Sequence, residues 1–512
     1  MNAQDPTDVL EAEYDHIVVG AGSAGSVLAR RLVDAGRSVL LVEAGGEDTR
    51  PEIHDPTNLW ALWESEVDYA YLTEPQEHAD GTVVSWPRGK VLGGSGALNG
   101  MIYVRGHRSD YDNWAYNGAY GWSYEEVLPY FKRSEDHEDG ESSYHGAGGL
   151  LPVRHNRDPD PVSTAFLNAA VESGVPANPD CNGEDILGAG YTQLNIVDGR
   201  RVSAWTSFVR PILGDPLLAV VTGALVSALT FTGERCTGIE VVRDGRTHIV
   251  RSRHDVIVSA GTIGSAQLLL LSGIGPADEL RALGLPVRAD LPGVGRNLHD
   301  HLLVPVVWES ARPLAQPHAN RLEVQFFARS DPAMLVPDLQ PLMVSMPLPV
   351  PGYDVPAQAY GVLAGLIRPL SRGRMWLRSA DPRQAPVLDP RIFAEPRDLT
   401  AMQAAVEMCR DIGEGKALAD WRVREVAPGP QVTTTDQLRA YIRRTVISYH
   451  HQVGTCRMGV DSEAVVDPAL RVHGVANLRI ADASVMPAVP SGNTNAPTIM
   501  IAERGAGLIL DS

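Results

Sequence analysis

Three glycines and a glutamate near the start of the chain have the types and spacing of a dinucleotide-binding site. Gly20, Gly22 and Gly25 form a GxGxxG pattern, and Glu43 ends the apolar run that follows. In this pattern the first glycine permits a tight turn, the second lets the backbone approach a pyrophosphate, and the third lets a helix pack against a strand. A carboxylate at the position of Glu43 accepts hydrogen bonds from ribose hydroxyls and repels a 2′-phosphate, which disfavours NADP. The pattern therefore predicts a site for NAD or FAD.

The residues around these glycines supply the elements that must position them. Residues 14–20 are a β-branched run typical of a buried strand, and apolar residues at helical spacing follow as far as Gly36. A second apolar strand is expected over residues 39–42. This order predicts a βαβ unit whose helix directs its positive N-terminal end at the phosphates.

Residues 87–101 form a second segment suited to a cofactor. The segment is too rich in glycine for a regular helix or strand, and it exposes backbone amides beside Ser95 and Asn99. Such a row of bare amides can lie along a flat ring system.

Five segments in colinear order resemble the signatures of the glucose–methanol–choline (GMC) flavoprotein oxidoreductases, with a choline dehydrogenase- or oxidase-like character. They are residues 87–101, 259–275, 291–301, 449–459 and 482–498. The similarity extends from about residue 14 to residue 510, with departures from the family pattern at Gly96, Ala266 and Gln452. The resemblance implies FAD rather than NAD, and the oxidation of a small or medium-sized alcohol. The electrons would then pass to oxygen, a quinone or another carrier.

The resemblance also implies cofactor contacts, residue by residue. It places the glycine pattern and Glu43 at the pyrophosphate and the adenosine ribose, and Val226 at the adenine. The positions implied around the flavin ring and its ribityl chain are Gly93, Gly94, Asn99, Gly100, Asp482, Ala483, Asn495 and Thr498. Leu98 stands where some relatives carry a histidine that links the flavin, so we expect FAD to be bound non-covalently.

The resemblance assigns the proton acceptor to His451, in the segment ahead of Val-Gly-Thr. A histidine can take the hydroxyl proton near neutral pH while a hydride moves from the same carbon to flavin N5. The amide of Asn493 would hydrogen-bond the substrate oxygen. A cyanohydrin-cleaving lyase that uses FAD only structurally is the alternative, and a flavin-binding protein without activity is a third hypothesis. His299 and His301 are as compatible with structural hydrogen bonds as with cofactor contacts.

Strand–glycine–helix patterns near both ends of the chain and near residue 255 predict an α/β protein (α+β overall) with a discontinuous domain. We expect a Rossmann-like FAD-binding domain from residues 13–157, 215–300 and 464–512. A substrate-binding domain built on a β-sheet is expected from residues 158–214 and 301–463. Its bulky residues are candidates either for pocket walls or for the core, and they are Trp308, Phe326, Phe327 and Tyr360.

Composition narrows the choice of partners. The 44 Lys and Arg residues against 63 Asp and Glu give a net charge of −19, which argues against a nucleic-acid partner. The same charge mildly favours neutral or cationic ligands, a choline-like cation included.

Four cysteines without a pairing pattern predict reduced thiols. Residues 1–15 lack signal-peptide features and the apolar runs are too short to span a bilayer, so we expect a cytoplasmic protein. No metal site is expected, and the polar, glycine-rich residues 135–149 predict a long surface loop.

Overall fold

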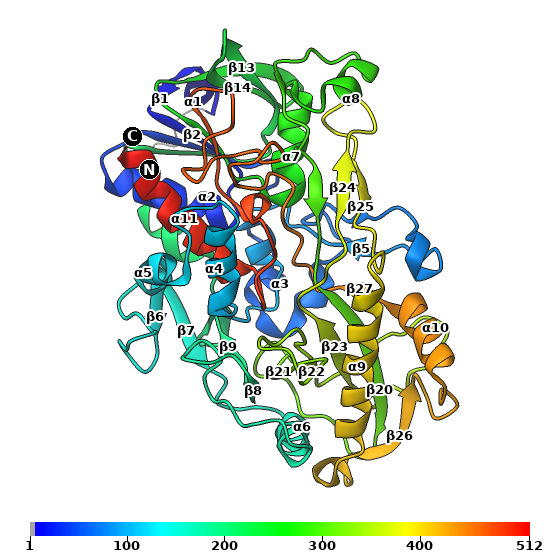
Figure 1. The fold of residues 1–512 in the computed structure, drawn as a ribbon. Helices are drawn as coiled ribbons and strands as arrows, with labels where there is room; N and C mark the ends of the chain where they lie inside the picture. Colours follow the sequence, from blue (N-terminus) through cyan, green and yellow to red (C-terminus); the bar gives the residue numbers. More distant parts are fainter. Residues whose placement is uncertain (1–5, 512) are drawn as a thin grey trace.

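A parallel sheet of five strands carries the predicted nucleotide site in the computed structural model, which describes residues 6–511 (Figure 1). Its order is β12 (Leu218–Val221), β3 (Val39–Val42), β2 (His16–Val19), β16 (Val256–Val258) and β28 (Leu478–Ile480). These strands are short apolar runs, because both faces of a parallel sheet are covered. They come from distant stretches of the chain, which confirms a Rossmann-like unit that is discontinuous in sequence. Residues 1–5, part of the stretch expected to lack a signal peptide, and residue 512 lie outside the described residues.

Three helices begin beside this sheet. They are α2 (Ser23–Asp34), α7 (Gly261–Leu271) and α11 (Asn495–Leu510), and the first and last lie side by side although they stand at opposite ends of the chain (Figure 1). Arg31 of α2 donates to the buried carboxylate of Glu503 in α11 at 2.7 Å. This ion pair holds the C-terminal helix against the nucleotide-binding helix.

A four-stranded sheet flanks the parallel one. It consists of β1 (Glu13–Tyr14), β15 (Arg246–Ser252), β14 (Arg235–Arg243) and β13 (Leu225–Thr232). The turn at Asp244–Gly245 joins β14 to β15, and both turn residues have positive φ, as their residue types favour. The apolar residues 217–226 have the pattern of a single strand, but the chain turns at Gly223 and divides them between β12 and β13.

A larger antiparallel sheet forms the second half of the molecule (Figure 1). Its order is β26 (Arg422–Ala427), β20 (Leu302–Ser310), β23 (Ala359–Leu366), β22 (Leu342–Val344), β21 (Val324–Phe327) and β8 (Gly188–Tyr191), and β27 (Ile447–Ser448) also pairs with β20. The helix α9 (Pro396–Gly413) packs on β20 and β23, with α6 (Pro161–Glu172) and α10 (Thr435–Thr445) beside it. The prediction of a second unit built on a β-sheet is therefore confirmed.

Shorter elements complete the chain. The helices are α1 (Pro6–Glu11), α3 (Pro51–His54), α4 (Arg108–Tyr116), α5 (Tyr124–Ser134) and α8 (Ala277–Ala282). Two three-stranded sheets contain β19 (Arg296–Leu298), β24 (Gly373–Trp376) and β25 (Val387–Asp389), and β6 (Glu135–His137), β7 (Leu151–His155) and β9 (Gln193–Leu194). The two-stranded pairs are β4 (Tyr71–Leu72) with β5 (Ser85–Trp86), β10 (Ile196–Val197) with β11 (Arg200–Arg201), and β17 (Ile274–Gly275) with β18 (Ala289–Asp290).

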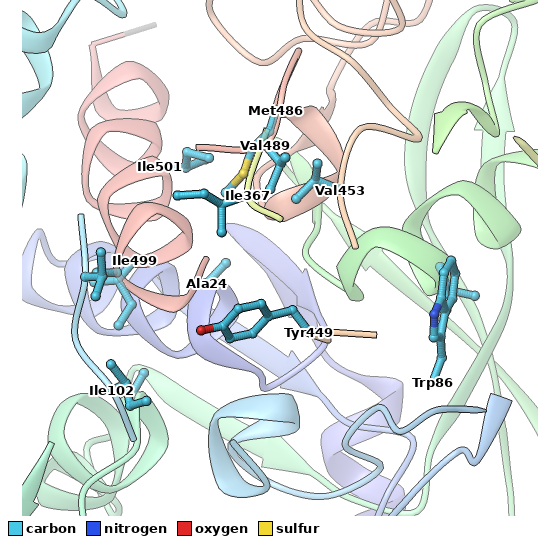
Figure 2. Close-up of a cluster of buried hydrophobic side chains, with 14 of the residues drawn as sticks. Ala24, Trp86, Ile102, Ile367, Tyr449, Val453, Met486, Val489, Ile499 and Ile501 are labelled. Carbon is cyan, nitrogen blue, oxygen red and sulfur yellow. The ribbon is translucent and has the colours of Figure 1, made fainter. Parts of the chain in front are cut away.

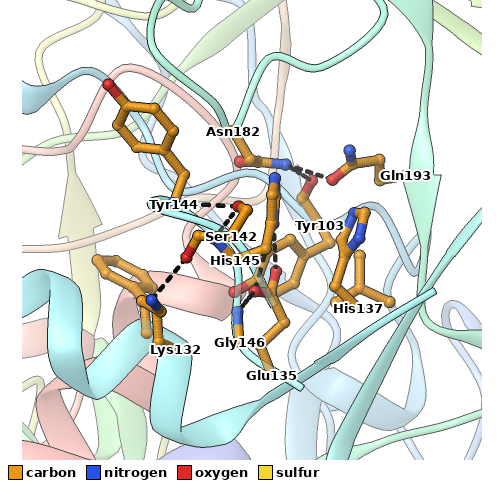
Figure 3. A network of polar contacts seen from close by, with 12 residues as sticks. Tyr103, Lys132, Glu135, His137, Ser142, Tyr144, His145, Gly146, Asn182 and Gln193 are labelled. Atoms are coloured by element: carbon orange, nitrogen blue, oxygen red, sulfur yellow. Dashed lines mark hydrogen bonds and ion pairs between the residues drawn. The ribbon is translucent and has the colours of Figure 1, made fainter. Parts of the chain in front are cut away.

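Residues 135–149, predicted to form a long surface loop, are fixed in place by hydrogen bonds and ion pairs of buried charged side chains (Figure 3). Its first three residues form β6, and the fully buried carboxylate of Glu135 accepts from Arg105 at 2.6 Å and from the amide of Gly146 at 2.7 Å. His145 bridges Glu135 to Asp180 through its two ring nitrogens. Burial alone would lower the pKa of His145, but the hydrogen bonds to these carboxylates raise it to about 9.

The segment around His451 is anchored in the hydrophobic core (Figure 2). Val453 packs beside Met486 and Val489, and Tyr449 is buried on the other side of the segment. Because the side chains on both sides of His451 are buried, its backbone has little freedom to move.

Candidate active site

A cavity of about 1050 Å³ lies between the parallel sheet and the large antiparallel sheet. All of the residues predicted for the cofactor and for catalysis line it except Gly25 and Gly93. The structure thus brings together side chains that are separated by up to several hundred positions in the sequence. The four bulky candidates for pocket walls are absent from this cavity; Trp308, Phe326, Phe327 and Tyr360 are fully buried in the core.

The glycines at one end form a cradle that admits no side chains. A Cβ on Gly20 would lie 2.6 Å from the carbonyl oxygen of Ser259, and one on Gly25 would lie 1.8 Å from the carbonyl oxygen of Gly20. Gly22 closely approaches Gly94, where a Cβ would lie 2.8 Å from the Cα of Gly22. The N-terminal end of α2 opens into this cradle, where its unpaired amides suit a pyrophosphate.

Gly25 and Gly93 shape the cradle without lining it. Gly25 lets α2 pack onto the end of β2, which is the role that the spacing predicts. Gly93 has a φ of +97° and donates its amide to the carbonyl of Ala21 at 2.9 Å. It therefore fastens the second glycine-rich segment to the first.

Glu43 stands at the end of β3, where the sequence predicts it. Its Oε2 accepts from the amide of Ala21 at 2.9 Å and its Oε1 from the amide of Gly45 at 2.8 Å. Burial raises the pKa of Glu43 to about 7, although these amides oppose the shift. Val226, at the start of β13, lines the same end of the cavity.

The polar residues along the middle of the cavity are oriented by hydrogen bonds. Asp482 accepts from the amide of Gly261 at 2.8 Å and from the Ser265 hydroxyl at 2.5 Å. Asn495 accepts from the hydroxyl of Ser23 at 2.6 Å. Also on this wall are Asn99, Gly100, Ala483 and Thr498. A glycine cradle at one end and this polar wall beside it fit an FAD molecule laid along the cavity.

His451 and Asn493 meet at the other end of the cavity. The Nε2 of His451 lies 3.3 Å from the Nδ2 of Asn493. On its other side, the Nδ1 of His451 lies 3.0 Å from the Nδ1 of His301, and the ring of Tyr449 stacks on it with centroids 4.6 Å apart. The backbone amide of His451 donates to Asp300 at 2.7 Å.

Burial lowers the pKa of His451 well below the usual value of 6.5, and the neighbouring His301, His450 and Arg88 lower it further. Its imidazole is therefore neutral at neutral pH and able to accept a proton. Burial also lowers the pKa of His301, to about 3, so this ring is neutral too.

Sequence reasoning missed the roles of three residues at this end, which are Gln340, Asp300 and His301. Gln340 donates to the Oδ1 of Asn493 at 3.0 Å. Asp300 accepts from the backbone of His451, and also from Ser448 and Gln452. Asp300 and His301 lie inside a segment that resembles a family signature, but nothing in the sequence pairs them with a residue 150 positions later. Gln340 stands in a proline-rich stretch with no motif at all.

The chain resembles known proteins over nearly all of its length. Residues 14–303 and 369–502 match two family models that are both described as GMC oxidoreductase. The chain belongs to the GMC oxidoreductase family. It is 41% identical over 534 residues to the mitochondrial choline dehydrogenase of Homo sapiens, covering 97% of this chain and 90% of that protein.

Two further similar proteins are named for other reactions than the oxidation of choline. The alcohol dehydrogenase (acceptor) of Pseudomonas putida is 37% identical, covering 97% of this chain and 96% of that protein. The crystal structure of pyridoxine 4-oxidase from Mesorbium loti superposes with a TM-score of 0.93 at 36% identity, covering 97% of this chain and 99% of that one. The protein is an FAD-dependent alcohol oxidoreductase, as its sequence motifs predict. No helix within residues 6–511 combines the length and apolar character needed to cross a membrane.

Proposed function

We propose that the protein oxidises an alcohol to an aldehyde or ketone, with His451 as the base and Asn493 as the hydrogen-bond donor to the substrate oxygen. The observation that supports this is the 3.3 Å separation of His451 Nε2 and Asn493 Nδ2 on the cavity wall. One oxygen atom placed against both can lose its proton to the imidazole while the amide N–H stabilises the developing negative charge.

A series of hydrogen bonds supports this division of roles. Gln340 donates to the Oδ1 of Asn493, which leaves the amide N–H group of Asn493 facing His451. That N–H group donates to Nε2 of His451, so Nε2 carries a lone pair and Nδ1 carries the proton. The Nδ1–H group can then donate to Nδ1 of His301, 3.0 Å away. His451 is thereby held in the tautomer that a base facing the cavity requires.

The cofactor is FAD, and we propose that it is held without a covalent bond. When bound, FAD accepts the hydride from the alcohol carbon. Leu98, on the cavity wall, offers no atom that could form a link to the ring. We also propose that the electrons pass on to oxygen or to another carrier such as a quinone.

We propose the domain limits given above, with residues 13–157, 215–300 and 464–512 as the FAD-binding domain and residues 158–214 and 301–463 as the substrate-binding domain. All five strands of the parallel sheet fall in the first set, and all seven strands of the large antiparallel sheet fall in the second. His451 is in the second set and Asn493 is in the first, so the proposed reaction takes place between the two.

Anaerobic mixing of the FAD-loaded protein with alcohols tests the function. We expect flavin bleaching by an alcohol, and a rate lowered about 100-fold or more in His451→Ala, with FAD still bound. His450→Asn is the matched control, because asparagine tolerates the positive φ of 67° at this position. Cyanide release from a cyanohydrin without bleaching would support the lyase instead, and full activity of His451→Ala would remove this residue from the mechanism.

A further inference from the structure

The part of the cavity beyond His451 has a wall of aliphatic side chains. Leu303 and Pro305 are alternate residues of β20, so their side chains project from the same face of the strand, and His301 directly precedes the strand. His301 contacts His451, and Leu303 and Pro305 line the cavity. The aliphatic wall therefore starts directly beside the proposed base.

The same wall continues across neighbouring strands. Pro305 is paired with Leu363 of β23, and Leu363 is paired with Leu342 of β22. All three line the cavity. Met346, Leu348, Pro349 and Pro351, which follow β22, add further apolar surface. Together these residues form a continuous apolar wall that favours a hydrocarbon chain over a charged group.

The carboxylates on the cavity wall either accept backbone amides or lie on the side of the cofactor cradle. They belong to Glu43, Asp68 and Asp482. Both oxygens of Asp68 accept backbone amides, from Glu64 on one side and from Ala70 and Arg88 on the other. Glu43 and Asp482 stand at the ends of β3 and β28, on the side of the parallel sheet where the cofactor cradle lies. Within residues 6–511, the aliphatic wall itself contributes no carboxylate to the cavity.

A positively charged side chain lines the cavity beside the proposed base, whereas the carboxylate of Asp300, which binds the backbone of His451, does not line it. Arg88 lines the cavity and donates to the carbonyl oxygen of His450 at 2.7 Å. In the described part of the chain, no carboxylate oxygen lies within 4.0 Å of its guanidinium nitrogens, although Asp68 and Asp300 lie near enough to influence it. A cationic substrate would therefore meet a like charge beside the reacting atoms.

The aromatic side chains on the cavity wall each contact another ring already, and they are Trp60, Trp63, Tyr69, Tyr71 and Tyr449. Tyr449 covers the ring of His451 with one face, and Trp63 contacts His450, the residue to which Arg88 is bound. Tyr69 and Tyr71 stack on one another, and the carboxylate of Glu43 adds to the burial that raises the pKa of Tyr69. Because the aliphatic wall described within residues 6–511 contributes no carboxylate, a quaternary ammonium buried against it loses its hydration without an opposite charge to compensate.

We infer that this enzyme takes uncharged alcohols with an apolar carbon chain and selects against quaternary ammonium alcohols such as choline. The inference rests on the proposed function, and it separates this chain from the choline dehydrogenases to which it is similar. Of the neutral and cationic ligands that the net charge favours, it selects the neutral ones, because the distant surface charges matter less than the groups that line the site.

Two probes of equal shape test this directly with the FAD-loaded enzyme. Choline and 3,3-dimethylbutan-1-ol differ only in whether the branched centre is a charged nitrogen or a carbon. We expect kcat/KM for flavin reduction to be at least about 100-fold higher for the uncharged alcohol. Binding of both probes to FAD-loaded His451→Ala, followed by flavin absorbance, should show the same preference without turnover.

Leu303→Glu places a carboxylate on the wall beside His451, with Leu303→Gln as the uncharged control. We expect the preference for the uncharged probe to fall at least about tenfold in the glutamate variant and to persist in the glutamine variant. If Leu303→Glu does not retain FAD, Leu363→Glu on the neighbouring strand serves the same purpose. Equal or better use of choline by the wild-type enzyme would overturn the inference alone. Failure of every alcohol, choline included, to bleach the flavin would overturn the proposed function with it.

Discussion

In the proposed reaction His301 acts only through His451, because its own side chain does not line the cavity. We propose that it is a positioning residue, which accepts the Nδ1 proton of His451 and so leaves the lone pair of Nε2 facing the cavity. We expect His301→Leu to lower kcat about 10- to 100-fold with little change in KM, since leucine cannot accept this proton.

His301→Asn is the matched variant, because its Oδ1 can replace the accepting nitrogen. Recovery of most of the activity in His301→Asn, at an unchanged ratio of FAD to protein, would separate proton acceptance from packing. Equal loss in both variants would contradict the proposed role.

The pH dependence of the reaction follows from the buried state of His451. Burial and the fields of His301, His450 and Arg88 hold its pKa well below 6.5. Because only the neutral imidazole accepts a proton, activity should be constant through neutral pH and fall only as the pH approaches this lowered pKa, well below 6.5. The profile of kcat/KM for an uncharged alcohol measures this. Arg88→Gln should move the acidic limb to higher pH, and a wild-type limb centred above pH 7 would contradict the prediction.

The sequence predicted individual residues best where chemistry and motif coincide. His451 and Asn493 were placed together because each stands in a segment that resembles a family signature. Gln340 could not be found this way, since its role comes from a hydrogen bond to a residue 153 positions later and leaves no local pattern. The sequence could not decide whether the bulky residues line the pocket or the core, because a side chain such as Trp308 suits both, and the structure places it in the core.

Close packing of α2 against β2 is the feature of the nucleotide-binding unit that is most sensitive to a single methyl group. A Cβ on Gly25 would lie 1.8 Å from the carbonyl oxygen of Gly20, so Gly25→Ala must displace the helix. We expect a loss of about 1–3 kcal/mol in the free energy of unfolding and a marked fall in FAD content.

Gly507→Ala in α11 is the matched control for that variant. A Cβ there meets nothing within 4 Å, so alanine should stabilise the helix by about 0.5–1 kcal/mol. Thermal unfolding and flavin absorbance measure both variants. Normal FAD content in Gly25→Ala would show that the helix is not held where the structure has it.

Elements were predictable where a local pattern determines them. The turn at Asp244–Gly245 follows from two residues that tolerate positive φ, and the strands of the parallel sheet follow from short apolar runs. Residues 135–149 were misjudged because polarity and glycine content indicate a loop but do not show where its charges go. Glu135 is buried through its ion pair with Arg105, thirty residues earlier in the chain, and that pairing arises only in the tertiary structure.

The whole molecule is organised around a cavity that neither half encloses alone. One side consists of the glycine cradle and the ends of the parallel strands, and the other consists of β20, β22 and β23. A cofactor that lies along this cavity contacts both halves, so its binding energy adds to the stability of the whole fold.

Removal of FAD should therefore weaken the entire protein. We expect acid precipitation to release all flavin into the supernatant, because the proposed attachment is non-covalent, and colour that remains in the washed pellet would contradict this.

Apoprotein prepared under milder conditions should unfold at a temperature lower by several degrees than the holoenzyme, and FAD should restore the difference. FMN is the control, since it lacks the adenosine portion that would reach Glu43 and Val226. Equal protection by FMN would show that the nucleotide end of the cavity contributes nothing, and that the first glycine pattern has been assigned the wrong role.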